Sequence, residues 1–200
     1  MENNFYHGTV RMHYVAKKMA SATMSRADDL KIREVVKLNA HYHEEMYKQM
    51  FHLENFDYSF TVVRNPINRL ISDYFYHKKL GYDHRTLDAY CNHLKNARKN
   101  GNKGIYGHLR TQQEFIGTTI KNIYRYEDGF ESITRSLSQH LPEVEHFKVP
   151  HMNPSYVPYD PVELWESCSE HSKTIVEVVY GEDFKNLNYD FKPEPNNVRD

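Results

Sequence analysis

Residues 58–74 read YSFTVVRNPINRLISDY, and this stretch decides the fold class. Its first six residues, Tyr58–Val63, are mostly β-branched or aromatic, which is typical of a buried central strand. The strand ends before Pro66, because proline cannot donate to a β-ladder, and proline is favoured in the first turn of a helix. Leu70 and Tyr74 then start an apolar helical face. A buried strand that leads directly into a helix indicates an α/β sheet.

Strands and helices alternate along the rest of the chain. The other expected strands are residues 9–15, 118–124 and 147–149. The other expected helices are a stretch that ends at Val36, residues 44–53, 87–99 and 162–179, and a helix that follows Gly129 and ends at Leu141. This alternation predicts an α/β domain with a mostly parallel central sheet flanked by helices. Ligands of such sheets bind beyond the carboxyl ends of the strands.

The length and composition exclude several classes of protein. A chain of 200 residues fits one domain, residues 1–200, and the polar, proline-containing segment 189–200 predicts a loosely held tail. The 26 Lys and Arg against 27 Asp and Glu exclude a histone-like cation. No signal peptide and no membrane-spanning apolar run is visible, and the two cysteines form no CxxC pair. We therefore expect a cytoplasmic protein with neither a membrane nor a nucleic acid as its partner.

Small and hydroxyl-bearing residues follow the first expected strand, in the segment 16–24 (AKKMASATM). A loop of this kind before a helix offers backbone N–H groups and hydroxyls to an anion, and a lysine adds a positive charge. It is not a Walker A loop, because the glycines of GxxxxGK[ST] are missing. The alternative is a solvated Lys17-Lys18 pair before an ordinary helix.

A second anion site is expected where the central strand ends. Arg64 emerges there, and Ser72 follows two helical turns into the next helix. A planar guanidinium and a hydroxyl on one side form a suitable clamp for a phosphate monoester. The alternative is that Arg64 and Arg69 only cap the helix or pair with Asp73.

The segment 64–74 resembles the 3′-phosphate motif of sulfotransferases that use 3′-phosphoadenosine 5′-phosphosulfate (PAPS). The motif R-[ND]-P-x-x-R-L-x-S-x-Y is matched throughout this segment. The segment 18–24 is similar to the family's 5′-phosphosulfate loop, with Lys17 in place of the usual proline and Ala22 where a hydroxyl residue is common. The resemblance implies a P-loop-like sulfotransferase fold that binds PAPS, releases 3′,5′-bisphosphate adenosine (PAP) and needs no metal. The donor-binding residues that it implies are Lys18, Met19, Ala20, Ser21, Ala22, Thr23, Met24, Arg64 and Ser72.

Later segments extend the resemblance along most of the chain. They are HLRTQ at 108–112, YRYED at 124–128, HMNPS at 151–155, YGEDF at 180–184 and YDF at 189–191. Their order and spacing are similar to those of the carbohydrate sulfotransferases of the Golgi type (chondroitin, HNK-1 and heparan 2-O). A saccharide acceptor is therefore implied, and the reaction is the transfer of a sulfuryl group to a hydroxyl.

The pair His41 and His43 provides candidates for the base that this reaction needs. The pKa of histidine near neutrality suits proton removal, and heparan 2-O enzymes have a similar HxH pair at a similar distance before their RDP motif. The resemblance thus implies His43 or His41 as the base, with His108 in reserve, and Lys18 as the group that stabilises the leaving phosphate. Because the chain has 13 histidines, a chance HxH pair is the alternative.

The sequence leaves two other functions open. It also leaves open the role of the basic segment 92–111. A P-loop nucleotide kinase is disfavoured by the absent Walker A loop, and a non-catalytic anion- or glycan-binding module on the same fold is the second alternative. Residues 92–111 contain five cationic side chains and no acid, which suits either an anionic glycan or a solvated surface.

Overall fold

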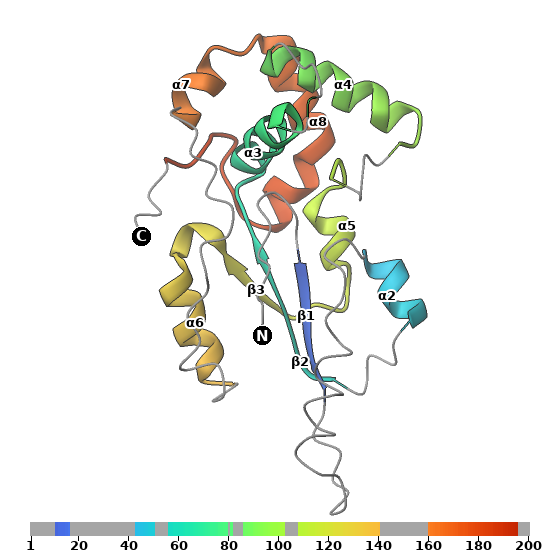
Figure 1. The fold of residues 1–200 in the computed structure, drawn as a ribbon, viewed down its shortest axis with the longest axis vertical. Helices are drawn as coiled ribbons and strands as arrows, with labels where there is room; N and C mark the ends of the chain where they lie inside the picture. The colour runs from blue at the N-terminus through green and yellow to red at the C-terminus, as the bar shows by residue number, and fades with distance from the viewer. Residues whose placement is uncertain are drawn as a thin grey trace, which may run out of the picture.

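The computed structural model describes residues 11–16, 43–50, 56–79, 81, 86–102, 108–140 and 160–195 (Figure 1). The expected helix that ends at Val36, the strand at 147–149 and the segment 151–155 lie outside these residues. No helix in the described part of the chain is long and apolar enough to cross a membrane.

Three strands form the described sheet, in the order β1-β2-β3. They are β1 (Arg11–Ala16), β2 (Phe56–Val63) and β3 (Asn122–Arg125). Strands β2 and β3 are parallel, as expected, whereas β1 is antiparallel to β2, with Ala16 opposite Phe56. The expectation of a mostly parallel sheet is thus wrong for the described strands, which form a mixed sheet. The segment that joins β1 to β2 is long enough to permit either direction, so the alternation of elements alone did not fix it.

Seven helices and one short 3₁₀ turn accompany the sheet in the described part of the chain. They are α2 (Glu44–Met50), α3 (Pro66–Lys79), α4 (Leu87–Lys99), α5 (Gln112–Ile116), the 3₁₀ turn η3 (Tyr126–Asp128), α6 (Phe130–Ser138), α7 (Pro161–Glu166) and α8 (Glu170–Asn186). Helices α3, α4, α7 and α8 gather beyond the carboxyl end of β2, while α6 lies on one side of the sheet and α2 with α5 on the other (Figure 1). The end of β2 therefore faces the helices that carry most of the larger core cluster.

The prediction of a single helix at residues 162–179 is wrong, because two helices, α7 and α8, occupy this region. Asp160 caps α7, and its carboxylate accepts a hydrogen bond from the N–H of Val162. Ser169 caps α8, and its hydroxyl accepts from the N–H of Ser172. Side-chain oxygens that bind backbone N–H groups in this way start a new helix. The serines around Cys168 thus interrupt an apolar periodicity that continues on both sides.

The larger core cluster holds the end of β2 in place. Val63 and Ile67 are at most 1% exposed and pack with Leu94 of α4 and Val176 of α8. A smaller cluster of Phe60, Ile133 and Leu137 lies under α6. Because buried apolar side chains surround the β2–α3 junction, the backbone at this junction is rigidly positioned.

The segment after α8 returns to the start of α3. The side-chain amide of Asn65 donates to the carbonyl oxygen of Lys192 at 2.8 Å, and that of Asn68 donates to the carbonyl oxygen of Glu194 at 2.7 Å. The N–H of Glu194 donates back to Asn68 at 2.8 Å. Lys192 and Glu194 are therefore bound to the start of α3, within the segment that the sequence predicts to be a loose tail from residue 189. Residues 196–200 lie beyond the described part.

Candidate functional site

Arg64 leaves the carboxyl end of β2 with its backbone held on both sides. The side-chain carbonyl of Gln112 accepts from the Arg64 N–H, and its amide donates to the Arg64 carbonyl oxygen, both at 2.8 Å. Gln112 is 1% exposed and thus extends the strand by one residue in the manner of a neighbouring strand. The Arg64 side chain is half-buried, and its guanidinium carbon lies 4.8 Å from the centre of the Tyr126 ring. This packing holds the cation at the rim of the sheet.

Asn65 caps α3 and anchors it to the next strand. Its side-chain oxygen accepts from the N–H groups of Ile67 and Asn68 at 2.9 and 3.2 Å. Its own N–H donates to the carboxylate of Glu127 at 2.7 Å. The other oxygen of Glu127 accepts from the Tyr189 hydroxyl at 2.8 Å. One carboxylate therefore joins β2, the end of β3 and the segment after α8.

Arg69 serves to hold the backbone at residues 108–110. It is 3% exposed, and its guanidinium donates to the carbonyl oxygens of Arg110 and His108 at 2.8 and 3.1 Å. Ser72 is likewise 3% exposed within α3. Of the two residues expected to clamp a phosphate, Arg64 reaches the solvent-facing rim and Ser72 is buried.

Asp183 holds the amino end of α5, which carries Gln112. Its two carboxylate oxygens accept from the N–H groups of Gln112 and Gln113 at 2.7 and 2.8 Å. Burial raises the pKa of Asp183, although these two hydrogen bonds oppose the shift. The carboxylate is fully buried, so its function is to fix the position of Gln112 rather than to meet a ligand.

His43 lies near the carboxyl end of α5, whereas Asp183 and Gln112 lie at its amino end. It directly precedes α2, and its carbonyl oxygen accepts from the N–H groups of Met46 and Tyr47. The Tyr47 hydroxyl donates to the carbonyl oxygens of Phe115 and Ile116, at the carboxyl end of α5. The half-buried His43 thus lies on the side of the sheet where α2 and α5 pack together (Figure 1).

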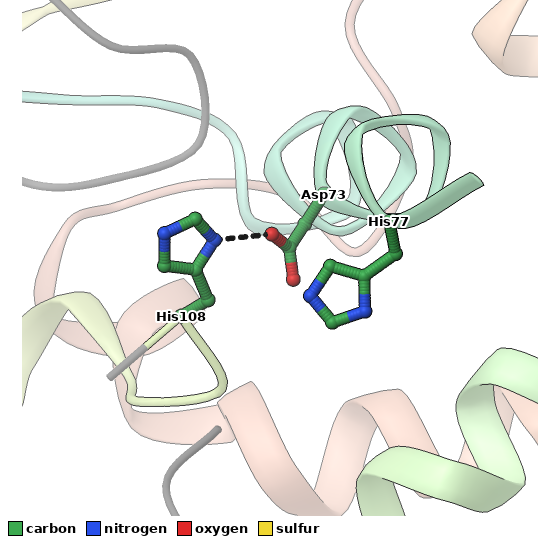
Figure 2. Close-up of side chains that lie close together, drawn as sticks. All are labelled: Asp73, His77 and His108. Carbon is green, nitrogen blue, oxygen red and sulfur yellow. Dashed lines mark hydrogen bonds and ion pairs between the residues drawn. The ribbon is translucent and has the colours of Figure 1, made fainter. Parts of the chain in front are cut away.

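A buried cluster of Asp73, His77 and His108 lies between α3 and the turn that precedes α5 (Figure 2). The Nδ1 atom of His108 lies 2.8 Å from Oδ1 of Asp73, and the Tyr90 hydroxyl donates to Oδ2 of the same carboxylate. Burial alone would raise the pKa of Asp73, but its interactions with His108 and the Tyr90 hydrogen bond outweigh burial and lower it. Burial lowers the pKa of His77, although the Asp73 carboxylate opposes the shift.

Two of the five cationic side chains of the segment 92–111 form internal ion pairs. Arg98 and Arg110 both bond to Glu114, at 2.8 and 3.3 Å. Lys95 and Lys99 are exposed on α4. This segment is thus partly a structural ion-pair network.

The remaining expected site residues lie outside the described part of the chain: Lys17, Lys18, Met19, Ala20, Ser21, Ala22, Thr23, Met24 and His41. If the sheet were parallel, the two expected anion-binding segments, which begin at Ala16 and Arg64, would lie at the same edge of it. Ala16 pairs with the start of β2, so the last residue of β1 and Arg64 lie at opposite ends of that strand.

Several residues of the site were not singled out from the sequence. Gln112, Glu127, Asp183 and Tyr189 lie in the segments HLRTQ, YRYED, YGEDF and YDF, whose pattern does not specify what each side chain contacts. Their positions in those segments were the only available signal, because each acts through a contact between segments that are far apart in sequence.

The hydrogen bonds around the β2–α3 junction and the half-buried Arg64 define an α/β protein with an arginine presented at the carboxyl end of a central strand. The model of the Sulfotransferase family matches residues 2–190, which is nearly the whole chain. This chain therefore belongs to the Sulfotransferase family, whose members are transferases of sulfuryl groups. No curated protein and no solved structure matches the chain significantly.

Proposed function

We propose that this protein transfers a sulfuryl group from PAPS to a hydroxyl of a saccharide. The observation that carries the proposal is the placement of Arg64. Its backbone is fixed on both sides by Gln112, and its half-buried guanidinium lies over the Tyr126 ring at the strand end. A guanidinium that is fixed before the ligand arrives binds a phosphate at a low cost in conformational entropy.

The residues at this strand end fit the 3′-phosphate of the donor. The first N–H groups of α3 already bond to Asn65, so they do not serve as the anion-binding groups. Arg64 is therefore the group that supplies the positive charge. The match of Ser72 to the family motif supports it as the second contact, made from its buried position in α3.

The donor, when bound, supplies the sulfuryl group and a phosphate leaving group. The family resemblance supports Lys18 and the loop 18–24 as the group that holds the 5′ end of the donor, where Lys18 neutralises the charge that develops on the leaving phosphate. The pairing of Ala16 with the start of β2, at the opposite end of that strand from Arg64, is the observation against this part of the proposal. His43 accepts the proton of the acceptor hydroxyl. The half-buried position of His43 supports this role better than that of His108, which is 6% exposed and bonded to Asp73.

The resemblance of the segments 108–112, 124–128 and 180–184 to carbohydrate sulfotransferases supports a saccharide as the acceptor. The exposed Lys95 and Lys99 of α4 are positively charged and suit an anionic glycan. A hydroxyl of a charged polysaccharide is therefore the acceptor that we propose to test first.

A sulfate-transfer assay tests this proposal directly. Radiolabelled PAPS is supplied with a panel of glycans and small alcohols, and labelled product is measured for wild type and for His43→Ala, His41→Ala and His108→Ala. We expect transfer to at least one glycan and a rate about 10²- to 10⁴-fold lower for His43→Ala, with nucleotide affinity nearly unchanged.

The two adjacent lysines provide a matched control. Lys18→Ala is expected to lower the rate severely and Lys17→Ala only mildly, because Lys18 occupies the position of the family's loop lysine. The reverse order of the two effects would mean that the alignment of this segment with the family's loop is wrong by one residue. Binding of PAPS without transfer to any acceptor would favour a non-catalytic module.

A further inference from the structure

The cluster of Asp73, His77 and His108 has no part in the proposed transfer of sulfate. The three side chains are only 4, 5 and 6% exposed. Each offers one carboxylate oxygen or imidazole nitrogen, and these atoms all lie within 4.8 Å of one another. Among the residues that the structure describes, it is the only group of three such side chains found this close together.

The fold delivers the three side chains from two separate directions. Asp73 and His77 are four residues apart in α3, so they lie on one face of the helix. His108 comes from the turn before α5 and faces them across the gap (Figure 2). Two donors on one helix and a third from a distant segment converge here from different sides, as the ligands of a metal ion must.

The distances between the donor atoms fit a small tetrahedral ion. Ligands bound at about 2.0–2.1 Å to tetrahedral Zn²⁺ lie roughly 3.3 Å from one another. The separation of 2.8 Å between His108 and Asp73, and the upper limit of 4.8 Å for the group, lie on either side of that value. Changes of about 0.5 to 1.5 Å in the distances between the donor atoms, made by side-chain rotation, would therefore form the site.

The surroundings also orient the carboxylate. The Tyr90 hydroxyl donates to Oδ2 of Asp73, which directs Oδ1 toward His108. Partners of this kind, behind the ligand atoms, are a regular feature of metal sites.

We propose that Asp73, His77 and His108 form a Zn²⁺ site, with the fourth coordination position taken by water. Two imidazole nitrogens and one carboxylate oxygen suit Zn²⁺, whereas Ca²⁺ and Mg²⁺ require more oxygen ligands. The ion links α3 to the turn at 108–110, which Arg69 of α3 also binds through two carbonyl oxygens. The bound ion thus holds the turn at 108–110, and with it the start of α5 and Gln112, against α3.

Metal content and thermal stability of the full chain, with any affinity tag removed, test this site. The protein is stripped with a chelator and then titrated with Zn²⁺, and with Co²⁺ as a spectroscopic probe. We expect about one Zn²⁺ per chain, tetrahedral Co²⁺ absorption, and a melting temperature roughly 5 °C or more higher at a hundredfold excess over Kd.

The variants His77→Ala and Asp73→Asn should each lose the bound Zn²⁺ and the rise in melting temperature. His171→Ala, which removes an exposed histidine of α8, should keep both. Because the stripped wild type is itself titrated, the test does not depend on the folding of any variant. Absence of stoichiometric binding by wild type, or binding that both cluster variants retain, would overturn the site and leave a metal-free hydrogen-bonded cluster of Asp73, His108 and Tyr90.

Discussion

Gln112 shows how much of this site depends on single side chains that touch no substrate. Its amide group satisfies both backbone groups of Arg64, and Asp183 in turn holds the N–H of Gln112. The residue that presents the positive charge is therefore positioned by a chain of hydrogen bonds that are part-buried at Arg64 and buried at Asp183. Such bonds are costly to break to the extent that the partners left behind are shielded from water.

Replacement of Gln112 should thus affect both stability and nucleotide binding. We expect Gln112→Ala to lower the free energy of unfolding by about 2 kcal/mol or more, since two backbone groups lose their partner. Gln113→Ala is the matched control, because its amide makes only a long 3.4 Å bond to Gly117. Urea denaturation measures both variants, and equal losses would mean that the Gln112 bonds do not hold the strand end.

Glu44 is the residue that should govern part of the acid stability. Burial alone would raise the pKa of Glu44, but hydrogen bonds from Lys48, Thr118 and Thr119 outweigh burial and lower it from 4.5 to about 2. A carboxyl group with a lower pKa in the folded state stabilises the protein above its unfolded pKa. That stabilisation is lost as the pH falls toward the folded pKa.

The stability of wild type should therefore fall more steeply than that of Glu44→Gln as the pH is lowered from about 5 toward 2. Urea midpoints at a series of pH values measure this difference. Glu45→Gln, at the exposed neighbouring position, should follow the wild-type curve. Parallel curves for wild type and Glu44→Gln would contradict the assignment.

At the scale of the elements, the ends of helices determine how α2 meets α5. Gly117 ends α5 with a φ of 55°, and a Cβ atom there would overlap the carboxyl group of Glu44. Gly101, just beyond the end of α4, also has a positive φ, of 69°, but nothing lies within 4 Å of the corresponding position. The two glycines thus share a positive φ, which would strain any residue with a Cβ atom, and differ in their surroundings.

We expect Gly101→Ala to cost about 1 kcal/mol, from the positive φ alone. Gly117→Ala should cost at least 1 kcal/mol more, because Glu44 must also leave its hydrogen bonds with Thr118 and Thr119. Chemical denaturation of both variants measures the difference. The excess should shrink in a Glu44→Ala background, and an excess that persists there would have another cause.

Elements with strong local signals were predictable from the sequence. Pro66 marks the start of α3, and Asn100 with Gly101 marks the end of α4, since these residues act through their own backbone geometry. The boundary between α7 and α8 was missed because the apolar spacing continues through the serine caps. The direction of β1 depends on pairing between distant segments, which no local pattern specifies.

The candidate site was predictable to a similar extent. The end of β2 identified Arg64, because a buried strand that stops at a proline leaves few positions for a polar group. The burial of Ser72 and the partners Gln112, Glu127 and Asp183 depend on contacts across the fold. The family motifs marked these segments as significant without revealing what each side chain touches.

For the whole molecule, segments far apart in sequence meet at one place. The end of β2, the start of α5, the end of β3 and the segment after α8 are joined through Gln112, Glu127 and Tyr189. Figure 1 shows these segments around the carboxyl end of β2. The match to the family model covers residues 2–190, which include Gln112, Glu127 and Tyr189.

The central claim is that Arg64 at this junction binds the 3′-phosphate of an adenosine nucleotide. Calorimetric titration with adenosine 3′,5′-bisphosphate and with 5′-AMP tests it most directly, on wild type, Arg64→Ala and the exposed control Arg135→Ala. We expect wild type and Arg135→Ala to bind the bisphosphate far more tightly than 5′-AMP. Arg64→Ala should lose affinity for the bisphosphate by an order of magnitude or more, since a charge-assisted contact is worth about 1.5–3 kcal/mol. Equal affinity of wild type for the two nucleotides would contradict the account.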